Sequence, residues 1–292
     1  MEFTINWSPQ ARDLLRDGKI EIDRFKCPDW EGMIGDARVD APVYVHFPLV
    51  VGHNTLASVD WARIDAMMKD TNTPHVNLHL EPTRSALGEL DDDAVIEVCL
   101  RDVQCVVDRY GGDNVVLENV PYRTTQGDKY RAAILPEKIN WIVRAAGCRL
   151  LLDVGHARIS AEALALNPLD YMRELPLDRL GEVHTAGVLP YTQATHDKAM
   201  QYDGYEALLH KFEGEDIIGC NLDHFGMESA DDWAAFVWLI DKIKSGEARE
   251  PRFVSFEYGG IGAPFAWRSE RDVIARDVPR FYALVHGVKE KS

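Results

Sequence analysis

The sequence contains few cysteines and no pattern that would link them. Its 292 residues include five cysteines, an odd number, and none is spaced as C-x-x-C. This usage is typical of reduced thiols in a reducing compartment. No apolar run reaches the roughly 18 residues of a membrane-spanning helix, and the opening residues MEFTINWSPQARD lack the basic start and apolar core of a signal peptide. We therefore expect a cytoplasmic protein with no contact to a membrane.

Positive charge is also scarce. The chain has 32 basic against 48 acidic residues, a formal net charge of -16. A surface that binds a nucleic-acid duplex would have to work against the field of the whole molecule, so we expect no nucleic-acid partner. The chain also lacks low-complexity stretches and linkers rich in Pro, Gly or Ser, which predicts a single domain over residues 1–292.

Short apolar runs alternate with amphipathic stretches of helical period, such as residues 92–112 and 229–246. This alternation predicts an α/β fold with a parallel sheet, either an open doubly wound sheet or a (β/α)8 TIM barrel. The chain has no G-x-G-x-x-G turn, and its polar residues are spread over many strand ends, which favours the barrel. Nine strands are predicted, at residues 3–8, 22–28, 43–49, 75–82, 114–121, 149–156, 180–188, 217–225 and 252–260. A barrel takes eight, so we predict that 217–225 lies outside it.

Most of the predicted strands end in His, Asp or Glu. The residues are His46, His79, Glu118, Asp153, His156, His184 and Glu257. In a TIM barrel the carboxyl ends of all strands meet at one mouth, so these side chains should converge. One strand-end histidine is usually only a hydrogen-bonded rim residue, and the inference therefore depends on the whole set. Imidazoles and carboxylates without thiolates suit iron, manganese or zinc, and seven ligands exceed the need of one ion. We predict a site for two or three ions, in which Glu118 or Glu257 could bridge.

Other polar residues near the predicted mouth are candidates for substrate contact. Lys26 ends the second strand and is predicted to be catalytic together with Glu118 and Glu257, although a salt bridge at the rim would explain it equally well. Arg84, Arg123 and Arg158 follow ligand-bearing strands and are predicted to bind an anionic substrate group, with surface pairing as the alternative. Asn119 is predicted at the substrate site, where it could orient an imidazole.

An adjacent acid and histidine, Asp223 and His224, occur in the NLDHFG segment. They resemble a ligand pair, but they lie on the one predicted strand that we place outside the barrel. We therefore leave them out of the predicted metal site.

The order of these residues resembles the metal signature of the xylose-isomerase-like TIM barrels, over roughly residues 40 to 260. Four residues match the four-ligand core of that superfamily: Glu118, Asp153, His184 and Glu257. Three match the extra histidines of members with more than one metal: His46, His79 and His156. Within that superfamily, the chain is most similar to the multinuclear non-haem iron oxidases, whose members act on cysteine or other residues of ribosomally made peptides. The similarity lies in the order of three runs: LLLDVGHARIS, LDYMRELPLDRLGEVHTAGV and THD.

The resemblance implies an enzyme that uses two or three irons, or else Mn or Zn, with O2 and a small-molecule or peptide substrate. It also implies a partner protein that delivers the peptide. His196 matches a further ligand of those oxidases, but the usual Asp two residues earlier is Ala194 here, which leaves Asp197 as a substitute. The strand at 180–188 ends HTAGV, where the oxidases usually have a final histidine.

Three other functions fit the same barrel. A sugar or hydroxy-acid isomerase or epimerase would use one or two divalent ions, with Glu118 or Glu257 moving a proton. A phosphodiesterase of the endonuclease IV type is permitted by the ligands but disfavoured by the net charge. A metal-storing barrel without catalysis would hold its ions with every coordination position closed.

Overall fold

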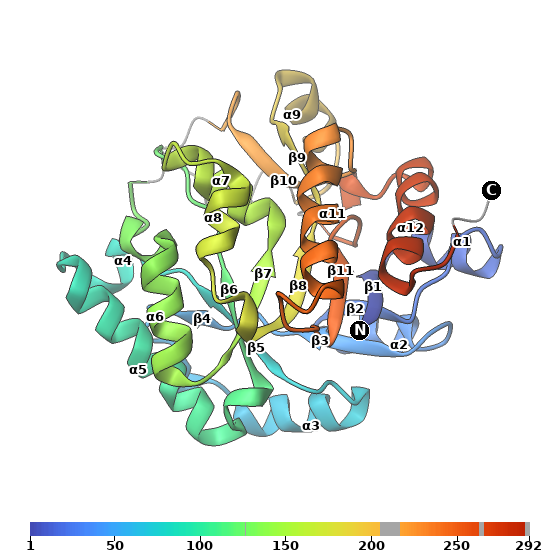
Figure 1. The fold of residues 1–292 in the computed structure, drawn as a ribbon. Helices are drawn as coiled ribbons and strands as arrows, with labels where there is room; N and C mark the ends of the chain where they lie inside the picture. The colour runs from blue at the N-terminus through green and yellow to red at the C-terminus, as the bar shows by residue number, and fades with distance from the viewer. Residues whose placement is uncertain (126, 205–216, 263–265, 290–292) are drawn as a thin grey trace.

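The computed structural model describes residues 1–125, 127–204, 217–262 and 266–289. Strands and helices alternate along most of this chain (Figure 1). The strands are β1 (Glu2–Asn6), β2 (Arg24–Pro28), β3 (Val43–His46), β4 (Val50–Val51), β5 (Val76–Leu80), β6 (Val115–Asn119), β7 (Arg149–Asp153), β8 (Leu180–Thr185), β9 (Gly187–Pro190), β10 (Asn221–Phe225) and β11 (Phe253–Phe256). The helices are α1 (Pro9–Arg16), α2 (Glu31–Ala37), α3 (Trp61–Thr71), α4 (Arg84–Leu87), α5 (Asp92–Tyr110), α6 (Pro136–Ala146), α7 (Val154–Ala163), α8 (Pro168–Glu174), α9 (Gln193–Ala199), α11 (Ala230–Lys244) and α12 (Arg271–His286).

The main sheet of the described residues closes on itself. Its parallel strands run in the order β3-β2-β1-β11-β8-β7-β6-β5-β4. The two ends of this order, β3 and β4, are separated in the chain only by residues 47–49, so they are halves of one interrupted strand. The nine strands therefore fill eight positions around a barrel, and the predicted α/β (β/α)8 TIM-barrel fold is confirmed.

Where β3 gives way to β4, a side chain replaces part of the strand ladder. The Phe47 amide donates to Oδ1 of Asn77 at 2.6 Å, and Nδ2 of Asn77 donates to the Phe47 carbonyl at 2.8 Å. The next bond in the ladder runs from the His79 amide to the Leu49 carbonyl at 2.8 Å. We call residues 43–51 and 76–80, joined in this way, the seam of the barrel.

Strand β10 lies outside the barrel, as predicted for residues 217–225. It pairs antiparallel with β9 in a separate two-stranded sheet. β9 follows β8 directly, so the chain leaves the barrel at Ala186 and carries this small sheet over the mouth side. The small sheet thereby brings a distant part of the chain beside α7, which contacts both of its strands.

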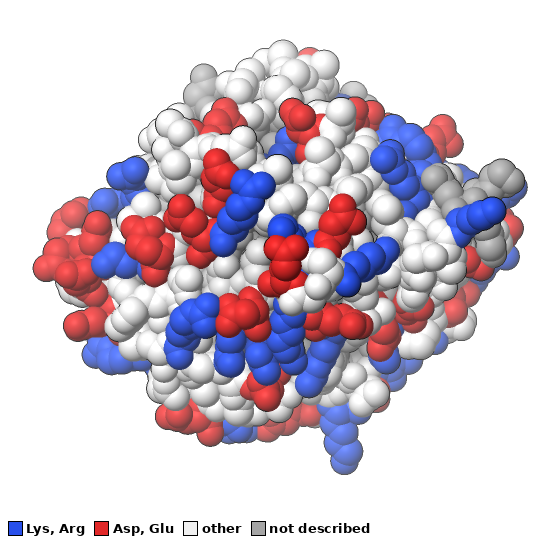
Figure 2. Space-filling model, in the orientation of Figure 1, with Lys and Arg blue, Asp and Glu red and all other residues white. Residues whose placement is uncertain are grey.

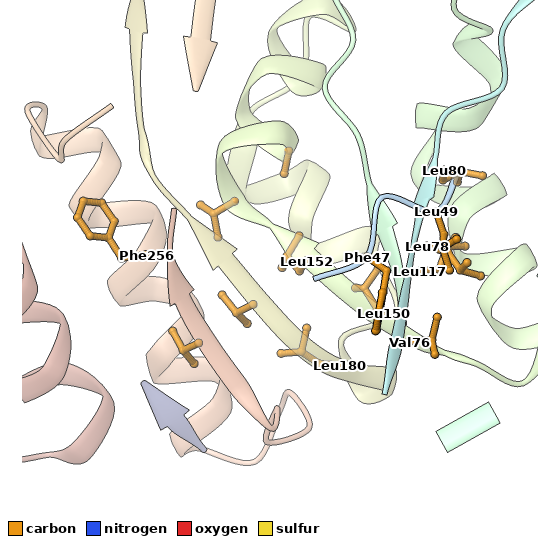
Figure 3. Packing of buried hydrophobic residues seen from close by; sticks show 14 of the residues in the cluster. Phe47, Leu49, Val76, Leu78, Leu80, Leu117, Leu150, Leu152, Leu180 and Phe256 are labelled. Carbon is orange, nitrogen blue, oxygen red and sulfur yellow. The ribbon is translucent and has the colours of Figure 1, made fainter. Parts of the chain in front are cut away.

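The barrel strands alternate apolar and polar residues with period two, because successive side chains point to opposite faces of a strand. The outward residues, such as Leu78, Leu117 and Leu152, are fully buried and join the main hydrophobic cluster with the helices (Figure 3). The alternate residues face the barrel interior and include His79 and Glu118, which are direct neighbours in the register of β5 and β6. The outward faces of these strands are therefore apolar, and the barrel interior holds polar side chains among apolar ones such as Val116 and Leu151.

Basic and acidic side chains are interspersed on the face of the molecule that Figure 2 shows. Many of them form ion pairs at the surface, such as Arg144 with Asp178. Among the described residues, the helices are all too short or too polar to cross a bilayer.

Candidate metal centre

A cavity of about 320 Å³ opens at the carboxyl ends of the barrel strands. Its floor contains five of the seven predicted ligands: His46, His79, Glu118, His156 and Glu257. The remaining two, Asp153 and His184, lie directly below and belong to the same set of close contacts. The structure therefore brings all seven residues close together. Six of them belong to groups of possible ligands, three of which are described here, and Glu257 lies beside His184.

The first group consists of His46, His79 and Glu118, whose ligand atoms lie within 4.8 Å of one another. Nε2 of His46 is 3.1 Å from Nε2 of His79, and Oε2 of Glu118 is 3.5 and 3.4 Å from these two nitrogens. This oxygen is buried and has no hydrogen-bond partner among the described residues. Ligands held about 2.1 Å from one ion are themselves about 3.0–3.4 Å apart, so these separations fit a shared metal.

Main-chain contacts fix the tautomers of this group. Nδ1–H of His79 donates to the Leu49 carbonyl at 3.0 Å, which leaves a lone pair on Nε2. Nδ2 of Asn77 donates to Nε2 of His46 at 3.1 Å, so this nitrogen is also an acceptor. His79 therefore has a free lone pair for a metal ion, whereas His46 Nε2 would have to give up its hydrogen bond from Asn77 to bind one.

The second group consists of Glu118, Asp153 and His184. Nδ1 of His184 lies 3.8 Å from Oε1 of Glu118 and 3.0 Å from Oε1 of Glu257. Glu118 therefore offers Oε2 to the first group and Oε1 to the second, as a bridging carboxylate would. Burial opposes the charge of Glu118, but His79 and its other histidine neighbours lower the pKa of Glu118 to about 2.

The third group consists of His156, Asp223 and His224. Nε2 of His156 is 2.7 Å from Oδ2 of Asp223, and Nε2 of His224 is 3.5 Å from the same oxygen. Nδ1–H of His156 donates to the Asn119 carbonyl at 2.8 Å, and Nδ1–H of His224 donates to the Glu257 carbonyl at 3.0 Å. His224 has φ +62°, a left-handed backbone that few residues other than Gly adopt and that often occurs at functional sites.

Local chain geometry explains why Asp153 and His156 reach the same site. Asp153 ends β7 and is the N-cap of α7, where its Oδ1 accepts from the His156 amide at 2.8 Å. Asn119 ends the neighbouring strand and holds this corner: its Nδ2 donates to the Asp153 carbonyl, and its Oδ1 accepts from the Asp153 amide. We predicted Asn119 at the substrate site, where it could also orient an imidazole. In the structure its side chain holds the main chain of Asp153 and thereby orients the possible ligands.

The charge balance of the site calls for cations. Four carboxylates, on Glu118, Asp153, Asp223 and Glu257, are at least nine-tenths buried. The facing ammonium group is that of Lys26, which contacts Glu257 and lies 3.4 Å from Nδ1 of His184. Burial lowers the pKa of Lys26 to about 8, although neighbouring carboxylates favour its charged form. Neighbouring carboxylates, Asp153 and Asp223 foremost, outweigh burial and raise the pKa of His156 to about 10. A proton on this imidazole, or a metal ion in its place, would offset the remaining negative charge, so the residues present fit a metal site.

The third group corrects the predicted ligands His196 and Asp197. Both lie on α9, where His196 packs against Tyr191 and Asp197 accepts from Gln193. Neither belongs to a group of possible ligands in the part of the chain that the structure describes. The reason is topological, because α9 follows β9 after the chain has left the barrel, whereas β10 returns to the mouth. Asp223 and His224, which we had left out of the predicted site, belong instead to the group of possible ligands with His156.

Each of the three predicted substrate arginines is held by another part of the chain. Arg84 donates to the carbonyls of Gly127 and Lys129 and stacks on the ring of Tyr130, so it fastens the β6–α6 loop. Nε of Arg123 donates to the Asn221 carbonyl at 2.9 Å. Arg158 forms an ion pair with Asp232, whose side chain is fully buried. None of these arginines lines the cavity above the ligands, and Arg123 lines a second cavity of about 290 Å³. Their role in substrate binding stays a prediction.

Gly187 makes the small sheet possible, because a Cβ on this residue would overlap the carbonyl of Gly226. We expect Gly187→Ala to separate β9 from β10, to lower the free energy of unfolding by about 1–3 kcal/mol and to weaken any metal binding at Asp223 and His224. Urea unfolding and metal analysis of the purified variant measure both effects. Gly32→Ala is the matched control, since a Cβ there meets no atom within 4 Å. Equal metal content in the two variants would contradict this role of the small sheet.

The comparisons with known proteins agree with this geometry. A family described as "RiPP precursor modification enzyme MbnB/TglH/ChrH" matches residues 38–213, more than half of the chain. A UPF0276 protein of Acaryochloris marina is 33% identical over 87 residues, which are 28% of this chain and 29% of that relative. The match therefore spans less than a third of the relative's length.

Solved structures resemble the whole fold at low sequence identity. A D-psicose 3-epimerase with D-tagatose from Clostridium cellulolyticum has a TM-score of 0.55 at 11% identity, with all of both chains covered. Endonuclease IV from Thermus thermophilus has a TM-score of 0.53 at 13% identity, covering 99% of this chain and all of the other. Identities this low establish a shared barrel and no shared reaction.

Proposed function

Since the chain belongs to the MbnB/TglH/ChrH family of RiPP precursor modification enzymes, we propose that it is a multinuclear iron oxidase that uses O2 to modify a residue of a ribosomally made peptide. The observation that supports the proposal best is the set of adjoining ligand groups, two of which share Glu118. A barrel that needed one ion would have no use for the first and third groups. Iron is the proposed metal because its imidazole and carboxylate ligands without thiolate suit it, and because O2 chemistry needs a redox-active ion.

Iron bound in these groups would supply redox chemistry and open coordination positions for O2 and the substrate. The chain itself shapes the space above the ligands. One wall of the cavity is apolar and includes Trp7, Trp30 and Met33, which would exclude water and accept the side chains of a peptide. Trp30 is 44% exposed and stands at the entrance, where a peptide could first make contact.

Lys26 is the residue best placed to act on a bound substrate. Its ammonium group is buried at the cavity floor beside Glu257 and His184, and its pKa of about 8 allows it to hold or release a proton near neutral pH. Glu257, at the end of β11, holds Lys26 in this position. The opposite rim is closed by the ion pair of Lys129 with Glu81 at 2.6 Å, which ties the β6–α6 loop to the end of β5.

Metal analysis of protein purified without chelator or added metal tests the proposal, together with an optical and EPR spectrum of the same sample. We expect two or more irons per chain. A single manganese, magnesium or zinc ion would overturn the oxidase and favour an isomerase that uses one ion, with Lys26 or Glu257 as the proton carrier. A chain that takes up no metal would contradict both functions.

A further inference from the structure

A second set of buried polar side chains lies below the metal centre, inside the barrel. Glu182 on β8 is fully buried, and Tyr44 on β3 and His75 before β5 are buried around it. The TIM-barrel interior is usually packed with branched apolar residues, so a carboxylate at this depth is unusual. None of these three residues was predicted to have a function from the sequence.

Glu182 accepts hydrogen bonds from three sides. Nε2 of His184 is 2.7 Å from Oε1 of Glu182, and the Tyr44 hydroxyl donates to the same oxygen at 2.9 Å. Nε2 of His75 contacts Oε2. Three groups that can donate a hydrogen bond thus converge on the two oxygens of Glu182, so its carboxylate is placed to accept from each of them.

His184 differs from the other imidazoles of the site in the way it is held. His79, His156 and His224 each donate Nδ1–H to a main-chain carbonyl and present Nε2 to the ligand groups. His184 is turned around: its Nε2 faces Glu182, and its Nδ1 faces Glu118 and Glu257. Since Nε2 of His184 faces a carboxylate oxygen that also accepts from the Tyr44 hydroxyl, the geometry orients Nε2 as the donor and leaves the lone pair on Nδ1, toward Glu118 and Glu257.

We propose that Glu182 is a positioning residue that fixes the tautomer and ring orientation of His184, so that Nδ1 serves as a ligand in the group with Glu118 and Asp153. Tyr44 and His75 hold the carboxylate in turn, which makes Glu182 the hub of a buried network. A carboxylate behind a ligand imidazole also raises the basicity of that imidazole. A main-chain carbonyl raises the basicity of an imidazole less than a carboxylate does. His184 should therefore bind a metal ion more strongly than the other histidines of the site. The inference rests on the proposed metal centre.

The first measurement is made on the wild-type protein, and one variant serves only to assign its signals. In zinc-loaded protein labelled with 15N-histidine, long-range 1H–15N NMR spectra report which ring nitrogen of each histidine carries a proton, and the His184 signals are assigned by their absence in His184→Gln. We expect a proton on Nε2 of His184 and metal on Nδ1. Metal on Nε2 would overturn the proposal, because Glu182 would then be a ligand of a different group that includes His46.

The second measurement uses Glu182→Gln, with Tyr44→Phe as the graded control. An amide oxygen can still accept from His184 but carries no charge, so we expect one metal equivalent to bind about 10–100-fold more weakly, as measured by competition with a chelator. Tyr44→Phe removes one donor to Glu182 and leaves His184 untouched, so its effect should be smaller. We expect Glu182→Asp to bind the metal ion as weakly as Glu182→Gln, because its shorter side chain cannot reach Nε2 of His184.

The outcomes separate this inference from the proposed function. If wild-type protein binds no metal, the metal centre itself is refuted. If wild-type protein binds metal and Glu182→Gln binds every equivalent with unchanged affinity, only the role of Glu182 is refuted. Retained NMR signals from the outward core residues would show that the variant is folded, so that a loss of metal reports on the site.

Discussion

Glu118→Gln is expected to abolish two of the metal equivalents and to lower any metal-dependent activity by at least about 100-fold. Replacement of residues that only support a ligand already costs about 10–100-fold in metal affinity, and Glu118 offers an oxygen to two groups at once. A neutral amide cannot bridge two cations as a carboxylate does, because it carries no charge and only one acceptor oxygen. The third group, which does not include Glu118, should keep its ion. Metal analysis and chelator competition would show the stepwise loss.

Glu81→Gln is the matched control for this variant. Glu81 also lines the cavity, but its carboxylate is paired with Lys129 and belongs to none of the ligand groups of the described residues. We expect its metal content to equal that of the wild type. If Glu118→Gln retained every metal equivalent, the bridging role of Glu118 would be refuted and the cluster with it.

Arg158→Leu is expected to lower the free energy of unfolding by about 3–5 kcal/mol, the largest stability effect that we expect from a single polar residue here. Its partner Asp232 has no exposed surface and would keep two main-chain donors, from Val188 and Ser229, but no counter-charge. The pair links α7 to the start of β9 and to the first turn of α11. Urea unfolding followed by circular dichroism measures the change.

Arg144→Leu provides the comparison, because its ion pair with Asp178 is about half exposed on both sides. Exposed pairs contribute about 0–1 kcal/mol, so this variant should unfold close to wild type. The same pair of variants decides between the two interpretations of Arg158. Loss of activity in Arg158→Leu with unchanged stability would support the substrate-binding role that the sequence predicted.

The barrel could be predicted from the sequence because its signals are local. Each strand is a short apolar run that ends in a polar residue, and residues such as His79 and Glu118 are placed by strand period and register alone. Parallel strands with a common direction then bring their carboxyl ends together without further information. The convergence of seven strand-end residues on one centre follows from these rules.

The third ligand group could not be predicted in the same way, because its position depends on contacts between distant parts of the chain. His196 and His224 each stand beside an acidic residue in the sequence. The choice between them depends on where β9 and β10 lie, and this is decided by the close approach of Gly187 to Gly226. The adjacent pair Asp223–His224 was the available signal, and we gave it too little weight because its strand lay outside the barrel.

The contacts of the arginines could not be predicted for a related reason. Arg84 and Arg158 follow ligand-bearing strands, but their partners, the carbonyl of Gly127 and the carboxylate of Asp232, lie 43 and 74 residues away. Closeness in sequence to a ligand-bearing strand therefore does not predict where a long side chain such as that of arginine points. Glu182 was missed because its partners are on β3 and before β5, far from it in sequence.

The seam of the barrel couples closure of the fold to the first ligand group. Residues 43–51 carry His46 and residues 76–80 carry His79, and the same Asn77 side chain that joins the two segments also donates to His46. Any local opening that separates these two segments must also separate the imidazoles of His46 and His79. An ion shared between them would hold the barrel shut by about 2.7 kcal/mol at a concentration 100 times its dissociation constant. The metal ion would then stabilise the closed barrel, and in protein without metal the seam should be the first part of the barrel to open locally.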